Sequence, residues 1–503
     1  MNFFDPNIHL VITNNWITVT NFSYFAYQLF DKETSYLSEI AEAIENKWID
    51  ENTDVYQRLK HWDGIVRKFT LDKTHTIGKC PTGLLYIIED ICKRYQFPYD
   101  IVDQRVRPDP DISGIAKIPL RGYQEIAVDN AVRIGRGVID ACPRSGKTRV
   151  FCEIIRRLFL NTILIVPTDK IADQTLRTVE EFLGKGIGVH QVGLKNIENL
   201  TYIKVVIATV ATATDLPQSF YNTRKVLIMD EFHHSGSISA RKIFKKAEQC
   251  YYRIGGTGTF SRDGADILDM YALLSNVVYK ITPLELVKLG FLVPTKVFML
   301  PVITTRVRGG GSSFMAGFGR LGIFENEFRN SMVSKVTQIL YKNGKNVLIL
   351  VGTKKQGVTL KNLLVEVLGS NREKRFGIVE NVSAETDRNI LTEILQSFES
   401  REGNVKIVIG TSLMAEGVDL PNADALVLAR GGKGDVSLTQ ASFRVNTAVP
   451  DKKYGIIIDF SDKHSARLLK HSIERLKIYY KQPTFAIKIL EDLPQLEKEI
   501  ACP

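Results

Sequence analysis

The chain has little of what secreted, zinc-binding or membrane-spanning proteins need. Its six cysteines, at positions 80, 92, 142, 152, 250 and 502, include no Cys-x-x-Cys pair. This spacing argues against structural zinc and favours a reducing compartment. No apolar run approaches the ~18 residues of a spanning helix, and the start Met1-Asn2-Phe3-Phe4-Asp5 lacks the basic segment of a signal peptide. We therefore expect a soluble cytoplasmic protein with no membrane partner.

The net charge and the length of the chain indicate its type of binding partner and its number of domains. Lysine and arginine number 66 against 56 acidic residues, which gives a net charge of +10. A surplus of this size favours a polyanionic partner, above all nucleic acid. The 503 residues are enough for roughly three domains.

The most informative segment is 142–148, which reads CPRSGKT. It follows a short β-branched run at 137–140 and precedes a helical stretch at 149–160. A strand that ends in a Gly-Lys-Thr loop and opens a helix surrounds phosphate groups with backbone N–H groups and the positive end of the helix dipole. In such a cradle we expect Lys147 to reach the β- and γ-phosphates and Thr148 to bind Mg²⁺.

A second segment supplies the remaining chemistry. Residues 225–229 form another β-branched run, and Asp230 and Glu231 follow it directly. A carboxylate at a strand end can hold Mg²⁺, and its neighbour can polarise the water that attacks the γ-phosphate. We expect Asp230 to bind the metal and Glu231 to activate water. Together the two segments predict ATP and Mg²⁺ as the cofactors.

Strand and helix patterns alternate twice along the chain. The first series of expected strands is 137–140, 162–166, 204–208, 226–229 and 252–254, and the second is 346–351, 377–379, 406–410, 425–428 and 455–458. This alternation predicts two α/β domains, each with a parallel sheet covered by helices on both faces.

The flanks suggest the domain boundaries. The proline-containing linker 105–111 ends a mixed α+β region rich in aromatic residues, and 289–294 has the composition of a hinge. We expect four parts: a small α+β DNA-binding domain over 1–112, α/β domains over 113–295 and 296–460, and a helical C-terminal extension over 461–503.

Several basic or hydroxyl-bearing segments are candidates for nucleic-acid contact. Arg308 lies in a basic, glycine-rich insertion at 306–313. Thr168, Thr209 and Thr411 each follow an expected strand, where a small hydroxyl can touch a sugar–phosphate backbone. In the tail, apolar residues repeat at helical spacing, while basic residues share another face that is either solvated or in contact with DNA. The apolar set is Leu469, Ile473, Leu476 and Tyr480, and the basic set is Arg467, Lys470, Lys477 and Lys481.

The order of these motifs resembles the superfamily 2 helicases over about residues 120–460. The resemblance implies two RecA-like domains around an ATP cleft. It implies catalytic roles for Lys147, Asp230, Glu231, His233, Gln440 and Arg444. It implies nucleotide contacts for Arg121, Gln124 as the adenine reader, Pro143, Arg144, Ser145, Gly146, Lys147, Thr148, Gly417 and Asp419, and metal binding by Thr148 and Asp230. Thr257 and Thr259 match the element that couples ATP to nucleic acid.

The flanks resemble a narrower group, the UvsW-like helicases of tailed phages. Lys60-His61-Trp62-Asp63-Gly64, Gly83-Leu84-Leu85 and Arg262-Asp263-Gly264 carry this likeness. That group translocates on duplex DNA, migrates branches, regresses forks, unwinds R-loops or D-loops and anneals strands. The likeness implies branched-DNA remodelling in a host-cell cytoplasm. Trp62, Arg67 and Lys68 are expected duplex contacts, with a core position for Trp62 as the alternative.

Two departures from the family pattern leave other functions open. The phosphate loop lacks a leading glycine, because Ala141 or Cys142 stands there. The last motif places Phe443 and Thr447 where the family has Gly and its second Arg. That Arg usually acts as a finger on the γ-phosphate, so Arg444, Arg430 or Lys433 must replace it, or hydrolysis is weak.

The alternatives are therefore an ATP-switch protein that binds nucleic acid and hydrolyses ATP weakly, or a restriction-type or RNA-type motor of the same superfamily. Duplex or branched DNA is the expected partner, RNA within R-loops is a further one, and a monomer is expected.

Overall fold

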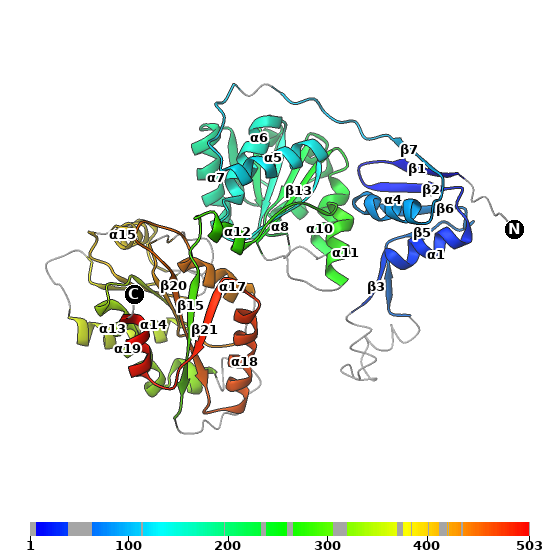
Figure 1. Ribbon diagram of the computed structural model, residues 1–503. Coiled ribbons are helices and arrows are strands. Elements are labelled where there is room, and N and C mark those ends of the chain that lie inside the picture. Colours follow the sequence, from blue (N-terminus) through cyan, green and yellow to red (C-terminus); the bar gives the residue numbers. More distant parts are fainter. Residues whose placement is uncertain are drawn as a thin grey trace. The chain divides into compact units, whose positions relative to one another are not determined.

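A computed structural model gives the structure of the protein (Figure 1). It describes residues 7–38, 63–111, 114–195, 197–232, 238–258, 265–304, 319–369, 376–383, 385–400, 402–411, 420, 422–433 and 436–501. The chain divides into two compact units. The first comprises Met1–Cys142 and Gly146–Ile281, and the second comprises Pro143–Ser145 and Thr282–Pro503.

The N-terminal region forms a five-stranded sheet in the order β5-β6-β2-β1-β7. Buried and exposed residues alternate along β1 and β2, so one sheet face packs on helices. β3 and β4 form a separate two-stranded antiparallel sheet. The elements are β1 Ile8–Ile12, β2 Trp16–Thr20, α1 Tyr24–Glu33, β3 Ser35–Leu37, β4 Ile65–Arg67, β5 Thr70–Leu71, β6 Ile77–Pro81, η1 Thr82–Leu84, α4 Leu85–Arg94 and β7 Tyr99–Asp103.

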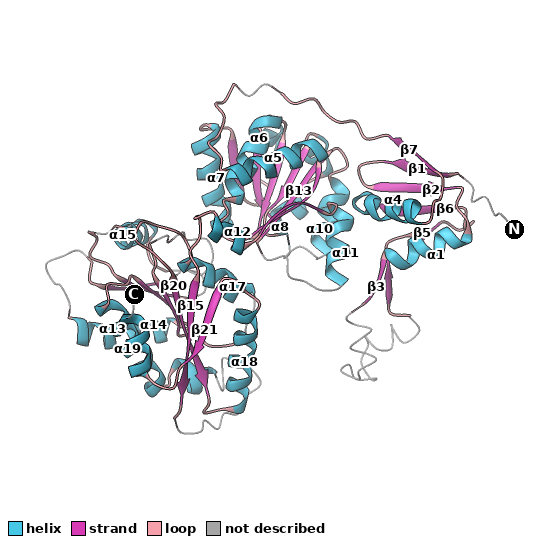
Figure 2. Cartoon of the chain, in the orientation of Figure 1, coloured by secondary structure: helices cyan, strands magenta, loops and turns pink. Residues whose placement is uncertain are grey.

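The rest of the first unit is built on a seven-stranded parallel sheet in the order β10-β11-β9-β12-β13-β8-β14. Helices cover both faces (Figure 2). The strands are β8 Arg136–Ala141, β9 Thr162–Val166, β10 Gly188–Gln191, β11 Val205–Thr209, β12 Val226–Met229, β13 Tyr252–Thr257 and β14 Val277–Ile281. The helices are α5 Gly122–Ile134, α6 Lys147–Leu158, α7 Asp169–Leu183, η2 Ile197–Tyr202, α8 Val210–Asp215, α9 Gln218–Asn222, α10 Ile238–Lys246 and α11 Ala265–Leu273.

The second unit contains another seven-stranded parallel sheet, in the order β17-β18-β16-β19-β20-β15-β21. One buried core joins the sheet to α13, α14 and α19, and a second core joins it to α15, α17 and α18. The strands are β15 Thr295–Val302, β16 Val347–Leu350, β17 Val379–Val382, β18 Ile407–Gly410, β19 Ala425–Leu428, β20 Gly455–Asp462 and β21 Phe485–Ile489. The helices are α12 Pro283–Lys288, η4 Arg320–Phe324, α13 Glu327–Lys342, α14 Lys354–Leu368, α15 Arg388–Glu399, α17 Val436–Ser442, η5 Phe443–Val445, α18 Ala466–Tyr480 and α19 Leu493–Ala501.

The two parallel sheets have the same topology. Counted from the first strand of each, both place their strands in the spatial order 3-4-2-5-6-1-7. The expected fold class is confirmed: two tandem RecA-like parallel-sheet domains with a small α+β domain before them. The C-terminal segment contributes more than helices, because β21 pairs in parallel with β15 at the edge of the second sheet. Among the described residues, no helix is both long and apolar enough to cross a membrane.

The buried face of α18 differs from the one that its apolar residues suggest. Ile473 and Tyr480 are exposed, while Arg475 and Tyr479 are buried. The reason is Asp459 on β20, a fully buried carboxylate. It accepts hydrogen bonds from Arg475 Nε at 2.8 Å and from the Tyr479 hydroxyl at 2.9 Å. A buried ion pair therefore fixes the face of this helix, and apolar periodicity alone could not reveal it.

We expect Asp459→Ala to lower stability strongly, because it leaves the Arg475 guanidinium buried without its carboxylate. Breaking a buried pair in this way costs roughly 3–5 kcal/mol, which corresponds to a fall in melting temperature of roughly 6–20 °C for a domain of this size. Calorimetric melting measures the effect. The double variant Asp459→Leu with Arg475→Met removes both charges and should recover most of the loss. A single variant that melts like the parent would contradict this account.

Candidate nucleotide and nucleic-acid site

The loop after β8 has the backbone of a phosphate cradle. Arg144 and Gly146 both adopt positive φ, +72° and +78°, and α6 begins at Lys147 directly afterwards. Gly146 is the N-cap residue of this helix, and as a glycine it supplies no side-chain acceptor for the first N–H groups. These N–H groups and the helix dipole face the loop, which is the arrangement that attracts anionic oxygens. The missing leading glycine therefore does not prevent the turn.

Lys147 faces the two carboxylates that follow β12. Its Nζ lies 3.4 Å from Glu231 Oε1 and 3.3 Å from the carbonyl oxygen of Ala141. Burial alone would lower the pKa of Lys147, but Glu231 and Asp230 outweigh it and the pKa is raised. The sequence separates these residues by more than 80 positions, and the parallel sheet brings them together at its carboxyl edge.

Asp230 is a desolvated carboxylate beside a second one. Burial first, and the charge of Glu231 second, raise the pKa of Asp230, while Lys147 opposes them. The backbone N–H of Glu231 donates to Asp230 Oδ1 at 2.9 Å, and Glu231 itself has a φ of +47°. A partly buried acidic pair of this kind is stabilised by cations. The carboxylate oxygens of Asp230 and the hydroxyl of Thr148, the second residue of α6, are ligand types that suit Mg²⁺.

Gly256 allows β13 to pass close to this acidic pair. A Cβ at this position would lie 2.4 Å from Phe151 Cζ and 3.2 Å from Asp230 Oδ1. Thr257, the next residue and the last of β13, is fully buried. Close packing therefore explains why position 256 is a glycine. It also places Thr257 beside Asp230, at the end of β12.

Gln124 lies against the phosphate loop. Its side chain is almost fully buried, and its Oε1 accepts from the backbone N–H of Arg121 at 2.9 Å, which forms part of a capping box at the start of α5. A Cβ at Gly146 would lie 2.5 Å from Gln124 Nε2. Gln124 and Gly146 are 22 residues apart in the sequence, yet the Gln124 amide packs against Gly146.

The threonines at strand ends have a local structural role. Thr168 and Thr209 cap α7 and α8, where their side chains accept from the N–H groups of Ile171 and Thr212, each at 3.4 Å. A capping hydroxyl can still donate its own proton to a phosphate, although the Thr209 hydroxyl now donates to Thr212 Oγ1 at 3.4 Å and would have to give up this long bond. Thr411 directly follows β18 in the second sheet.

The shared topology identifies one further threonine that the motif search missed. Thr353 caps α14 after β16, just as Thr168 caps α7 after β9, and it accepts from the Gln356 N–H at 3.1 Å. Because β16 and β9 are equivalent strands of the two sheets, Thr353 and Thr168 hold equivalent places. The available signal was Gly352-Thr353, which repeats the pattern of Pro167-Thr168.

The unusual last motif has a packing explanation. Phe443 is buried and its ring contacts Phe485 of β21 at a centroid distance of 6.0 Å. Thr447 pairs with Leu292 in an isolated antiparallel bridge. Arg444, between them, is half-buried in η5. Phe443 thus fills the core beside β21, where a glycine would leave space, and Thr447 joins the motif to the hinge segment.

Two of the expected duplex contacts in the N-terminal region, Arg67 and Lys68, form ion pairs with acidic side chains of the protein. Lys68 forms an ion pair with the buried Asp269 and stands 5.3 Å from the ring centroid of Tyr36. Arg67 is partly exposed and pairs with Asp63 at 2.7 Å and with Asp31 at 3.3 Å. The burial of Lys68 argues against a phosphate contact through this lysine.

Several expected site residues lie outside the described residues. They are Trp62, His233, Thr259, Arg308, Gly417 and Asp419. The backbone at Gln440 belongs to α17, but its side chain is outside the description.

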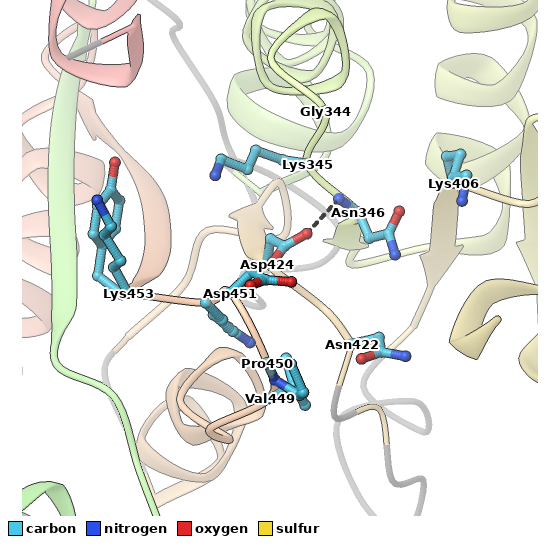
Figure 3. Close-up of a pocket in the computed structure, with 12 residues that line it drawn as sticks. Gly344, Lys345, Asn346, Lys406, Asn422, Asp424, Val449, Pro450, Asp451 and Lys453 are labelled. Atoms are coloured by element: carbon cyan, nitrogen blue, oxygen red, sulfur yellow. Dashed lines mark hydrogen bonds between the residues drawn. The ribbon is translucent and has the colours of Figure 1, made fainter. Parts of the chain in front are cut away.

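A polar cavity of about 480 Å³ opens in the second unit, at the amino ends of β16, β18, β19 and β20 (Figure 3). Four lysines line it, together with Asn346, whose N–H donates to Asp424 at 2.9 Å. The lysines are Lys345, Lys406, Lys452 and Lys453. None of the expected nucleotide or nucleic-acid residues lines this cavity, so it is separate from the motifs described above.

Comparisons with known families agree with this architecture. Residues 117–262 match the family "Type III restriction enzyme, res subunit", and residues 331–447 match "Helicase conserved C-terminal domain". The matches span 146 and 117 of the 503 residues. The first falls on the sheet with the phosphate loop and the second falls on the sheet with the last motif.

Individual relatives are distant. The chain is 25% identical over 357 residues to a DNA 3'-5' translocase, XPB2, of Sulfurisphaera tokodaii, which covers 63% of this chain and 76% of that one. A fragment of a putative HsdR subunit of a type I restriction enzyme from Vibrio vulnificus superposes with a TM-score of 0.55 at 18% identity, over 76% of this chain and 71% of that one. The crystal structure of T4 UvsW aligns over 96% of this chain and 99% of that one, with a TM-score of 0.43 and 16% identity.

The motifs, their placement at the sheet edges and the two family matches lead to one assignment. The chain belongs to the superfamily 2 helicases and is an ATP-hydrolysing motor of the helicase or translocase type that binds nucleic acid.

Proposed function

We propose that this motor translocates on duplex DNA and remodels branched DNA by branch migration, fork regression or the unwinding of R-loops and D-loops. The observation that carries the motor part is Lys147, which faces Asp230 and Glu231 at the carboxyl edge of the first sheet. The choice of DNA rests on the named activity of the Sulfurisphaera relative and on the basic net charge. The choice of branched DNA rests on the resemblance of the Trp62 and Gly83 segments to UvsW-like helicases.

Each proposed site residue has a defined task in this scheme. Lys147 and the N–H groups of the loop, including Ser145 and Gly146, hold the β- and γ-phosphates. Asp230 and Thr148 hold Mg²⁺, which when bound neutralises charge on the phosphates. Glu231 accepts the proton of the attacking water. By family resemblance, Arg444 donates to the γ-phosphate in place of the arginine that Thr447 replaces.

Four threonines are proposed to hold the nucleic-acid backbone. Thr168 and Thr209 do so from the first sheet, and Thr353 and Thr411 do so from the second, each at the carboxyl end of its strand. Hydroxyl and backbone contacts of this kind bind phosphates without reading bases. We therefore expect binding that depends on salt and on backbone form rather than on sequence.

A second candidate function is a weakly hydrolysing ATP switch. The specific observation in its favour is Thr447, which is tied to Leu292 where the family has a finger arginine. A restriction-type motor is also consistent with the first family match and with the HsdR likeness. Turnover separates the switch from a motor, and production of nicked or cut DNA separates a restriction-type enzyme from a remodelling one.

Branch migration on a synthetic mobile four-way junction with labelled arms tests whether the protein remodels branched DNA. We expect ATP-dependent resolution into two duplexes, and none with an ATP analogue that cannot be hydrolysed. An immobile junction and a blunt duplex of equal length serve as matched substrates. An enzyme that hydrolyses ATP on DNA but leaves the mobile junction intact would remove branch remodelling while keeping the motor assignment.

Gln124 gives a test of base selection. We expect Gln124→Ala to reduce the preference for ATP over GTP by roughly 10- to 100-fold, because the amide that reads adenine is lost. Competition kinetics with the two nucleotides measure it. Gln124→Glu keeps the helix cap, because its carboxylate can still accept from the Arg121 N–H. It presents no amide donor to adenine, so we expect it to lose the preference for ATP as well. An unchanged preference in both variants would make Gln124 a helix cap only.

A further inference from the structure

The N-terminal domain shares its hydrophobic core with a helix of the first parallel-sheet domain. The buried core around Phe30, Phe69 and Ile88 includes Ala272 of α11, and Tyr271 and Leu268 of the same helix pack against it. The ring of Tyr86 also meets Tyr271 edge-on, with centroids 6.0 Å apart. The contact is therefore a continuous apolar interface rather than a flexible tether.

One glycine makes this close approach possible. A Cβ on Gly83 would lie 1.9 Å from the carbonyl oxygen of Tyr271 and 2.7 Å from that of Ala272. These are backbone atoms, which cannot move aside as a flexible side chain does. Gly83 belongs to a segment that the sequence singled out, and its role in the fold is to let α4 and η1 lie against α11.

A buried carboxylate fastens the same contact. Asp269 of α11 is only 7% exposed. It forms an ion pair with Lys68, accepts a hydrogen bond from the Tyr36 hydroxyl at 3.0 Å, and pairs with Arg241 of α10 at 3.0 Å. Lys68 and Tyr36 belong to the N-terminal domain, so removing Asp269 leaves a buried ammonium without its counter-charge.

A second attachment lies on β13. Asn15, in the turn between β1 and β2, accepts at its Oδ1 from Arg253 Nη2 at 2.5 Å. Arg253 is 3% exposed and also donates to the carbonyl oxygens of Cys250 and Ala247, at 3.0 and 2.9 Å. Arg253 stands four residues before Thr257 on the same strand.

The two attachments stand on either side of Thr257 in the sequence. β13 ends at Thr257 and α11 is the next described element. By family resemblance Thr257 belongs to the element that couples ATP hydrolysis to nucleic acid. The N-terminal domain is therefore attached through buried contacts both to the strand before this element and to the helix after it.

We propose that Asp269 is a positioning residue through which the N-terminal domain takes part in coupling nucleic-acid binding to ATP hydrolysis. Asn15 serves as the second anchor on Arg253. This inference rests on the proposed function, since coupling requires a nucleic-acid-stimulated ATPase. In this role the carboxylate acts through α11, which it holds to the N-terminal domain so that the two move together.

The test compares Asp269→Asn with the parent in full-length protein, by basal and duplex-stimulated ATP hydrolysis. We expect basal turnover and the KM for ATP to stay near the parent values. The stimulation by duplex should fall by roughly 5- to 150-fold, the usual range of coupling between sites. Gly83→Ala should act in the same direction through sterics alone, so it covers the case in which Asp269→Asn does not fold. Asp90→Asn, which breaks an exposed pair with Arg94 on α4, should change neither rate.

The double variant Lys68→Met with Asp269→Leu separates positioning from DNA contact. It replaces the buried pair by apolar side chains of similar length, which retains the attachment, and it should keep the duplex stimulation. Folded Asp269→Asn and Gly83→Ala proteins with full stimulation would overturn the inference. Loss of stimulation in the double variant, together with weaker duplex binding, would also overturn it and would return Lys68 to a DNA contact. A parent protein with no stimulated turnover would instead refute the proposed function.

Discussion

Lys147→Ala is expected to reduce ATP hydrolysis by roughly 10²–10³, the usual cost of removing one preorganised donor from a site of developing charge. The Lys147 ammonium faces Glu231 and Asp230, and its pKa is raised by them, so it is charged when the triphosphate binds. Alanine removes that charge and leaves the two carboxylates to repel the nucleotide. Binding of duplex DNA should persist, because the proposed threonine contacts lie elsewhere.

Steady-state turnover and duplex affinity, measured side by side, check this result. Lys185→Ala is a suitable control, since Lys185 is an exposed lysine of the same unit and should leave both values unchanged. A Lys147→Ala protein with parental turnover would show that the phosphate loop is assigned to the wrong segment.

Glu231→Gln is expected to separate nucleotide binding from hydrolysis. The amide has the shape of the carboxylate but cannot take the proton of the attacking water, so turnover should fall by roughly 10²–10⁴. Binding should be kept or strengthened. Glu231 contributes to the raised pKa of Asp230, and its neutral replacement lowers that pKa and keeps Asp230 charged for Mg²⁺.

Nucleotide affinity in the presence of Mg²⁺, measured together with turnover, shows whether Glu231→Gln loses hydrolysis while it keeps nucleotide binding. Asp230→Asn is the contrasting variant, because it removes the proposed metal ligand and should lose affinity as well as turnover. If Glu231→Gln lost affinity to the same degree as Asp230→Asn, Glu231 would be a structural residue of the strand end and not the base.

Central strands were the easiest part of the fold to predict from sequence. The expected strands 162–166, 226–229 and 425–428 coincide with β9, β12 and β19, because a strand buried on both faces is a continuous apolar run. β10, β14 and β21 had no expected counterpart. Each lies at an edge of its sheet and is only partly buried, so its apolar pattern is weak. β15 was missed although it is central, and it contains Pro301, which argues against a central strand.

In the candidate site, too, some features could be predicted from the sequence and others could not. The phosphate loop and the Asp230-Glu231 pair could be predicted because each is contiguous in sequence and each follows a buried strand. The Asp269–Lys68 pair could not, since about 200 positions separate its members and nothing in either segment indicates the other. Likewise the ring that packs on Phe443 belongs to Phe485, a residue of an edge strand that the sequence did not reveal.

We assign this chain as a motor whose ATP hydrolysis depends on nucleic acid. Steady-state hydrolysis with no nucleic acid, with single-stranded DNA, with duplex DNA, with a four-way junction and with duplex RNA tests it most directly, and the Lys147→Ala protein gives the background. We expect low turnover alone, strong stimulation by duplex DNA and by the junction, and little by RNA. Turnover that is equal in all five conditions, or no turnover above the Lys147→Ala background, would contradict the assignment of a DNA-driven motor.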